Sequence, residues 1–188
     1  MSKSNPEMRI TDITMDLEAG TEKVPLAPVV YTLSANLNDS ALTKSVLGVL
    51  GLGKDKLPMD VDLEGAKFVP GGAEVTVNAG SGRFLRAKAT AVIGITANND
   101  ERVAVEIKEI KALGKLPIES IVGPILDKAL DKATAYPGVE RDSLKPRSLR
   151  IDPNVLLKSQ GVPLRFVQPG GWTVTTGPDI LTAVFSAE

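Results

Sequence analysis

The sequence contains no cysteine and no histidine in its 188 residues. Without cysteine the chain can form no disulfide, no thiolate metal site and no thiol nucleophile. Without histidine it lacks Ser-His and Cys-His catalysis and any imidazole ligand for a metal. Because these absences exclude the commonest catalytic and metal-binding arrangements, we predict a protein that is not an enzyme and that uses no cofactor and no metal.

Aromatic residues are also scarce, at 4% of the chain, and the charges nearly cancel to a formal net charge of −1. Few aromatic rings leave little surface for stacking on bases, and a balanced charge provides no attraction for a phosphate backbone. Nucleic acid is therefore excluded as an expected partner. The sequence leaves the oligomeric state open.

Long apolar runs are missing as well. The longest, residues 46–52, is interrupted by Gly48 and Gly51 and falls well short of the roughly 20 apolar residues of a spanning helix. The first eight residues are mostly polar and contain no core of a signal peptide. As it stands, the sequence predicts a cytoplasmic protein, or an extracytoplasmic one if a signal has been removed. We expect one domain over residues 1–188, with residues 1–7 disordered.

Alternating apolar and polar residues dominate the chain from Met8 onward and indicate β-strands. The clearest alternation covers residues 82–98 and returns after a turn signal at residues 98–101. It predicts a long antiparallel hairpin with one apolar face. Shorter strands are expected near residues 14–17, 59–64, 75–79, 164–167, 172–175 and 180–185.

Two segments carry apolar residues at helical spacing. The first helix is expected to begin at Asp39 or Ser40 as its N-cap and to end near the glycines at 51 and 53. The second is expected over residues 117–135, with a broad apolar stripe. Its 19 residues would span about 28 Å at 1.5 Å per residue, comparable to the hairpin.

These matched lengths predict an α+β fold, in which a long, strongly curved antiparallel β-sheet is wrapped around a long amphipathic α-helix, with a second, shorter helix. Small side chains at positions 87, 89 and 91 leave room on the inner face of the sheet, where an elongated apolar tunnel would lie between sheet and helix. The tunnel is the candidate ligand site, and its expected lining is Leu42, Val46, Leu50, Leu85, Ala87, Ala89, Ala91, Ile93, Val103, Val105, Ile107, Ile118, Ile121, Val122, Ile125 and Leu126.

A glycine-rich stretch, Gly48 to Lys54, fits the spacing of a phosphate-binding loop. Asp55 follows in place of the Ser or Thr that would hold magnesium, and a helix precedes the stretch instead of following it. We therefore interpret it as a helix end that runs into a glycine turn.

Four basic residues gather between the second helix and the last strands. They would suit a transient contact with anionic lipid headgroups at a membrane surface, or they belong to a solvated linker. Both interpretations stay open for this basic cluster, which consists of Arg141, Lys145, Arg147 and Arg150.

The order of these elements resembles a known family. One-sided strands lead through the link Ile110-Lys-Ala-Leu-Gly-Lys-Leu-Pro117 to an amphipathic helix, and the tail runs from Leu149-Arg-Ile-Asp-Pro-Asn to Gly161-Val-Pro-Leu-Arg165. This arrangement resembles the bacterial tubular lipid-binding (TULIP) superfamily, in particular the branch that includes the mycobacterial mannan-elongation factor. The resemblance implies a curved sheet around a long helix, an apolar tunnel for acyl chains and no catalytic residues.

Two classes of function follow from these expectations. The first is a carrier or transfer protein that binds a lipid, a fatty-acyl ligand or another hydrophobic molecule in the tunnel. The second is a non-catalytic structural or assembly domain of the same shape whose interior is filled by its own side chains.

Overall fold

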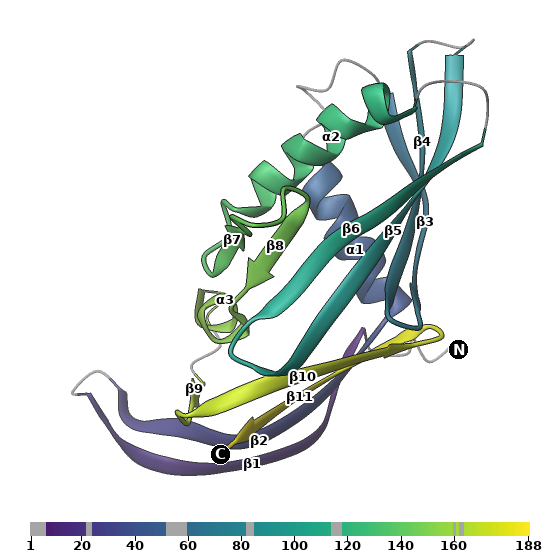
Figure 1. Cartoon of the computed structure of the whole chain (residues 1–188). Coiled ribbons are helices and arrows are strands. Elements are labelled where there is room, and N and C mark those ends of the chain that lie inside the picture. The colour runs from purple at the N-terminus through teal and green to yellow at the C-terminus, as the bar shows by residue number, and fades with distance from the viewer. Residues whose placement is uncertain are drawn as a thin grey trace.

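Antiparallel strands make up most of the described chain, and three helices lie against them (Figure 1). The structure is a computed structural model that describes residues 7–21, 24–51, 60–81, 85–113, 118–159, 161 and 164–188. It describes side chains at all of these positions except 20–21, 24–26, 49–51, 60–61, 79–81, 85–87, 112–113, 118–122 and 124–125. Residues 1–6 of the segment expected to be disordered lie outside the described residues.

The elements follow the chain in a simple order. The helices are α1 (Asp39–Gly51), α2 (Ile118–Ala133) and α3 (Pro153–Ser159). The strands are β1 (Met8–Thr21), β2 (Val24–Asn38), β3 (Asp60–Val69), β4 (Gly72–Ser81), β5 (Leu85–Asp100), β6 (Val103–Leu113), β7 (Val139–Arg141), β8 (Ser148–Ile151), β9 (Arg165–Phe166), β10 (Gly170–Gly177) and β11 (Ile180–Ala187).

The strand pairing places the N-terminal hairpin of β1 and β2 beside the C-terminal hairpin of β10 and β11. The main path of the sheet runs β1-β2-β11-β10-β5-β6-β8-β7, and β3 joins it through β4, which pairs with β5. These pairs are antiparallel, whereas the short strand β9 runs parallel to β2. The predicted long hairpin is confirmed as β5 and β6, and Asn99 in its turn has a φ of 55°.

Strand β5 is the point at which the sheet divides. One edge of β5 pairs with β6, while the other pairs with β4 along residues 85–94 and with β10 along residues 97–100. Glycines stand where the backbones meet: a Cβ on Gly72 would collide with the carbonyl of Ile93, and one on Gly171 would collide with the backbone of Asn99. Only glycine allows so close an approach, and this permits two strands to share one edge.

The predicted fold class, a sheet wrapped around one long helix, is wrong. The sheet is open, and the described helices have only 13, 16 and 7 residues. The physical reason is the division at β5, because a sheet that branches there does not continue around a helix. Helices α1 and α2 instead lie next to each other beside β3–β6, as Figure 1 shows.

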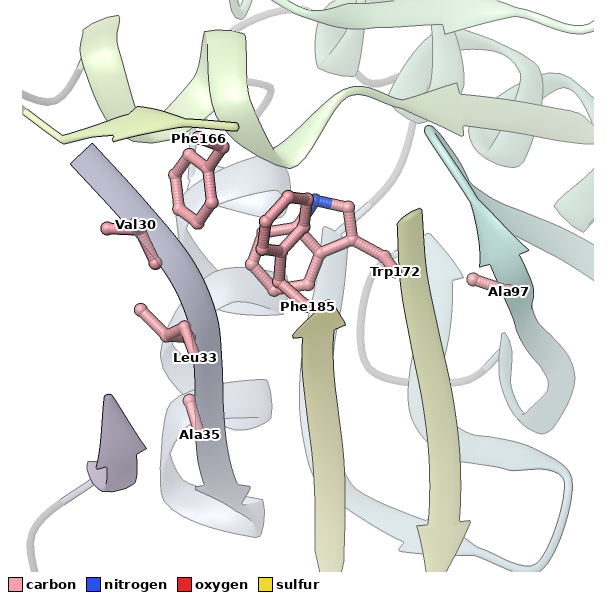
Figure 2. Packing of buried hydrophobic residues seen from close by; sticks show 7 residues of the cluster. All are labelled: Val30, Leu33, Ala35, Ala97, Phe166, Trp172 and Phe185. Carbon is pink, nitrogen blue, oxygen red and sulfur yellow. The ribbon is translucent and has the colours of Figure 1, made fainter. Parts of the chain in front are cut away.

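A core of seven buried residues lies between β2, β5, β9, β10 and β11. Three of the few aromatic rings meet there (Figure 2): the ring centroids are 4.8 Å apart for Phe166 and Phe185 and 5.4 Å apart for Phe166 and Trp172. Tilted and edge-on ring pairs of this kind stabilise a core beyond their area. Val30, Leu33 and Ala35 of β2 and Ala97 of β5 complete the cluster, and Leu33 is only 5% exposed.

Leu33→Ala is expected to lower the free energy of unfolding by about 2–5 kcal/mol, because it opens a cavity in this core. The matched control is Leu144→Ala, since Leu144 is 90% exposed and its truncation should change stability by less than about 0.5 kcal/mol. Urea denaturation of both variants measures the difference. Equal losses in the two variants would contradict the assigned core.

Candidate ligand-binding cavity

A cavity of about 760 Å³ lies between the strands β4–β6 and the helices α1 and α2, and it is partly open to solvent. Almost all of the side chains around it are apolar. The lining residues are Leu42, Lys44, Ser45, Val46, Gly48, Ala73, Val75, Val77, Ala89, Ala91, Ile93, Ile95, Val105, Ile110, Leu126, Ala129, Ala133, Tyr136, Val139, Leu149, Ile151 and Leu156.

The floor of the cavity is the inner face of β4 and β5. Alternation along each strand turns every second side chain inward, and the antiparallel register places these side chains opposite one another. Three opposed pairs of the lining couple a larger residue with an alanine: Ile93 with Ala73, Val75 with Ala91 and Val77 with Ala89. Because alanine projects only a methyl group, these positions leave space between the sheet and the helices.

A β-bulge in β6 extends the floor to the third strand. Ile107 is opposite Ile93 and Glu109 is opposite Val92, so Lys108 is an extra residue without a partner on β5. An extra residue reverses which side chains face inward beyond it. Ile110 therefore lines the cavity, although strict alternation from Val105 would turn it outward.

Helix α1 closes one side of the cavity, and polar contacts at its first turn hold it in place. Asn38 is the N-cap, because its Oδ1 accepts hydrogen bonds from the backbone N–H groups of Ser40 and Ala41, both at 3.1 Å. The expected cap, Asp39 or Ser40, is therefore one or two residues too late. The Asp39 carboxylate instead accepts a hydrogen bond of 2.7 Å from the backbone N–H of Phe68, which joins α1 to β3.

Helix α2 contributes Leu126, Ala129 and Ala133 and ends two residues before the predicted position. A tight turn ends it: the N–H of Val139 donates to the carbonyl of Tyr136 at 3.1 Å, and Gly138 has a φ of +82°. Proline at the second position and a glycine with positive φ at the third position are typical of a type II turn.

The basic cluster fastens the β7–β8 hairpin to the rest of the fold. Arg141 donates to the carboxylate of Asp131 at 2.7 Å and to the carbonyl of Asp127 at 2.9 Å, both on α2. Lys145 donates to Glu106 of β6 at 2.8 Å, and this hydrogen bond raises the pKa of Lys145. At least two of the four cations therefore have partners within the fold, which favours a structural role for them.

The few polar side chains of the lining belong to Lys44, Ser45 and Tyr136. The Lys44 ammonium lies 2.5 Å from a carboxylate oxygen of Glu7, and the Ser45 hydroxyl donates to the carbonyl of Ala41 at 2.9 Å. Within the part of the chain that the structure describes, no group of three or more acidic residues could hold a metal ion. The chemistry of the described lining is thus dominated by contact with apolar groups.

The predicted lining residues fall into three groups. Val103 packs against the aromatic core and Ile107 packs against a cluster of Leu130, Val139 and Leu149; neither Val103 nor Ile107 is part of the cavity lining. The cavity brings together Leu42, Val46, Ala89, Ala91, Ile93, Val105 and Leu126. The side chains of Leu50, Leu85, Ala87, Ile118, Ile121, Val122 and Ile125 lie outside the described part of the structure.

Several lining residues were missed by the sequence reasoning. Val75 and Val77 alternate clearly in the sequence, and that signal was sufficient to place them on an inner face. Ile110 was signalled only by the break in alternation after Ile107. Leu149 and Leu156 are brought to the cavity by the β7–β8 hairpin and α3, and local pattern contains no signal for such long-range packing.

Comparison with protein-family models, with curated proteins and with solved structures finds no match to this chain. The resemblance to tubular lipid-binding proteins therefore stays an expectation from the sequence pattern. Among the helices of the described residues, none is both long enough and apolar enough to cross a membrane.

Asn38→Ala is expected to lower the free energy of unfolding by about 1 kcal/mol, because two N–H groups of α1 lose their acceptor. Asn38→Asp keeps a side-chain oxygen at the same place and should remain near the parent. Thermal denaturation compares the two. If Asn38→Ala were as stable as Asn38→Asp, the Asn38 cap would not contribute to the stability of α1.

Proposed function

We propose that the protein binds a hydrophobic small molecule, such as a lipid with an acyl chain, in the cavity between β4–β6 and the two helices, and acts as a non-enzymatic carrier. The observation that carries the proposal is the cavity itself, with a volume of about 760 Å³ and a largely apolar lining. Pockets for small ligands fall between about 300 and 1,000 Å³ and have this kind of lining.

The energetics of burial support such a ligand. Each methylene removed from water contributes about 0.8 kcal/mol, so about ten of them would contribute roughly 8 kcal/mol before the costs of association. No charged group of these walls has to change position when such a ligand binds, because the side chains of Ala89, Ala91 and Leu126 consist of hydrocarbon only.

Binding, and not catalysis, is proposed because the described lining offers no nucleophile beside a base. The Ser45 hydroxyl donates to a backbone carbonyl of its own helix, and Lys44 is engaged by Glu7. The competing function, a structural domain with a filled interior, predicts that no apolar molecule enters the cavity.

The direct test is a titration of the purified protein with a fluorescent fatty-acid probe, together with mass spectrometry of material extracted by organic solvent. A saturable increase in fluorescence, reversed by unlabelled fatty acid, is the expected result. A flat titration with no extracted lipid would overturn the carrier function in favour of the structural domain.

Ala89→Phe is expected to weaken probe binding at least tenfold. Ala89 is 2% exposed and packs against Val77, Ile110 and Leu126, so a phenyl ring there must enter the cavity. Because the ring occupies space that is already open, the free energy of unfolding should fall by less than the roughly 1–3 kcal/mol typical of overpacking.

The matched control is Ala19→Phe, which adds the same ring at an exposed position of β1. It should bind the probe as the parent does. Unchanged binding in a folded Ala89→Phe protein would place the ligand elsewhere, and a loss of several kcal/mol of stability would indicate an interior already filled.

A further inference from the structure

Strand β1 forms one end of the sheet. It pairs with β2 along 14 residues, and within the described chain no strand pairs with its other edge (Figure 1). The backbone N–H and C=O groups along such an edge are a template for another strand.

The exposed edge also carries an apolar face. A β-bulge leaves Thr11 without a partner on β2, and the side chains opposite the buried residues Ala35, Leu33 and Val30 are therefore Ile10, Ile13 and Met15. The face that results contains Met8, Ile10, Ile13, Met15 and Leu17, of which all but Ile13 are 49–64% exposed.

The opposite face of β1 is charged. Arg9 and Asp16 both lie on it and are exposed, and neither forms an ion pair within the described residues. Asp12 and Glu18 share this face, and Glu18 accepts a hydrogen bond of 3.0 Å from Arg165. The charge therefore changes sign along the strand, from positive at Arg9 to negative at Asp16.

We propose that two copies of this chain pair through β1, antiparallel, about a twofold axis at Ile13. In this register Ile13 is opposite Ile13 of the second copy, and the bulge at Thr11 of each strand is accommodated symmetrically. The apolar faces then match, with Met8 opposite Leu17 and Ile10 opposite Met15. On the charged face, Arg9 of each copy is opposite Asp16 of the other.

Both the charge pairs and the apolar contacts favour the register centred on Ile13 over the register centred on Met15. A register centred on Met15, with Thr11 again left as the bulge, would oppose Asp12 to Glu18 and would leave Met8 without an apolar partner and Ile10 opposite only the small side chain of Ala19. In the register centred on Ile13, the only carboxylates that face each other are Glu7 and Glu18, and each already has a cation, Lys44 or Arg165. Opposite charges and apolar pairs directly across two strands both stabilise their pairing.

The contact is isologous, so the same residues serve on both copies and the assembly closes as a dimer. No residue of β1 whose side chain the structure describes lines the cavity, and pairing through β1 would leave the described lining uncovered. Pairing would extend the curved ribbon of β1 and β2 into a second molecule, and would supply hydrogen-bond partners for the free edge.

Charge reversal tests the register. Sedimentation equilibrium of the full chain is expected to show a reversible dimer, and Arg9→Asp or Asp16→Arg alone should weaken it about tenfold, because each variant opposes like charges twice per dimer. An equimolar mixture of the two variants should form a heterodimer, since both of its charge pairs are then attractive. The double variant Arg9→Asp/Asp16→Arg should recover the parent dimer, and the exposed control Lys158→Asp should leave it unchanged.

Cross-linking locates the axis. The chain has no cysteine, so Ile13→Cys introduces a single thiol, and two residues directly opposite in antiparallel strands lie within the Cα distance of a disulfide. Mild oxidation should give a covalent dimer of Ile13→Cys and little of the control Ile180→Cys. Circular dichroism verifies that each variant is folded.

A parent chain that stays monomeric at several hundred micromolar would overturn the proposal and leave the edge to a strand of some other protein. A dimer that neither charge variant weakens, or that Ile180→Cys cross-links as readily as Ile13→Cys, would overturn it by showing that another surface is used.

Discussion

Strand β5 pairs along one edge with two different strands, and this division fixes where the cavity and the aromatic core lie. The first half of that edge pairs with β4 and the second half with β10, so one strand belongs to two differently oriented parts of the sheet. Backbone hydrogen bonds allow this only where the three strands can approach closely, and Gly72 and Gly171 provide the space. The division keeps the sheet open and gives each part its own covering layer.

The unequal distribution of large side chains between these two parts explains the cavity. Phe166, Trp172 and Phe185 concentrate in the core at the β10 side, where their rings fill the interior. On the β4 side, the inward positions of β4 and β5 hold alanine, valine and isoleucine, and these do not reach α1 and α2 across the whole gap. Apolar space that the chain does not fill is the basis for proposing a hydrophobic ligand there.

The candidate ligand cavity and the β1 edge lie on different parts of the molecule. The two proposed binding modes depend on different interactions. The cavity offers non-directional burial of apolar surface, and its lining includes none of the side chains that the structure describes on β1 and β2. The edge offers directional backbone hydrogen bonds in a register selected by Arg9 and Asp16. A dimer formed through β1 would therefore leave both cavities accessible, so the proposed ligand binding does not depend on the proposed dimer.

Local structure could be predicted from the sequence, because period-two and helical spacing depend only on neighbouring residues. The hairpin of β5 and β6, the inward position of Ala89 and the two longer helices follow from it, with errors of one or two residues at Asn38 and Ala133. Three features depend on contacts between distant parts of the chain and could not be predicted from local pattern. They are the open sheet, the bulge that turns Ile110 inward and the position of Leu149 in the cavity wall. Alternation shows which face of a strand is apolar, but backbone hydrogen bonds are alike in every sequence, so only the packed chain decides which strand pairs with which edge and which apolar faces meet.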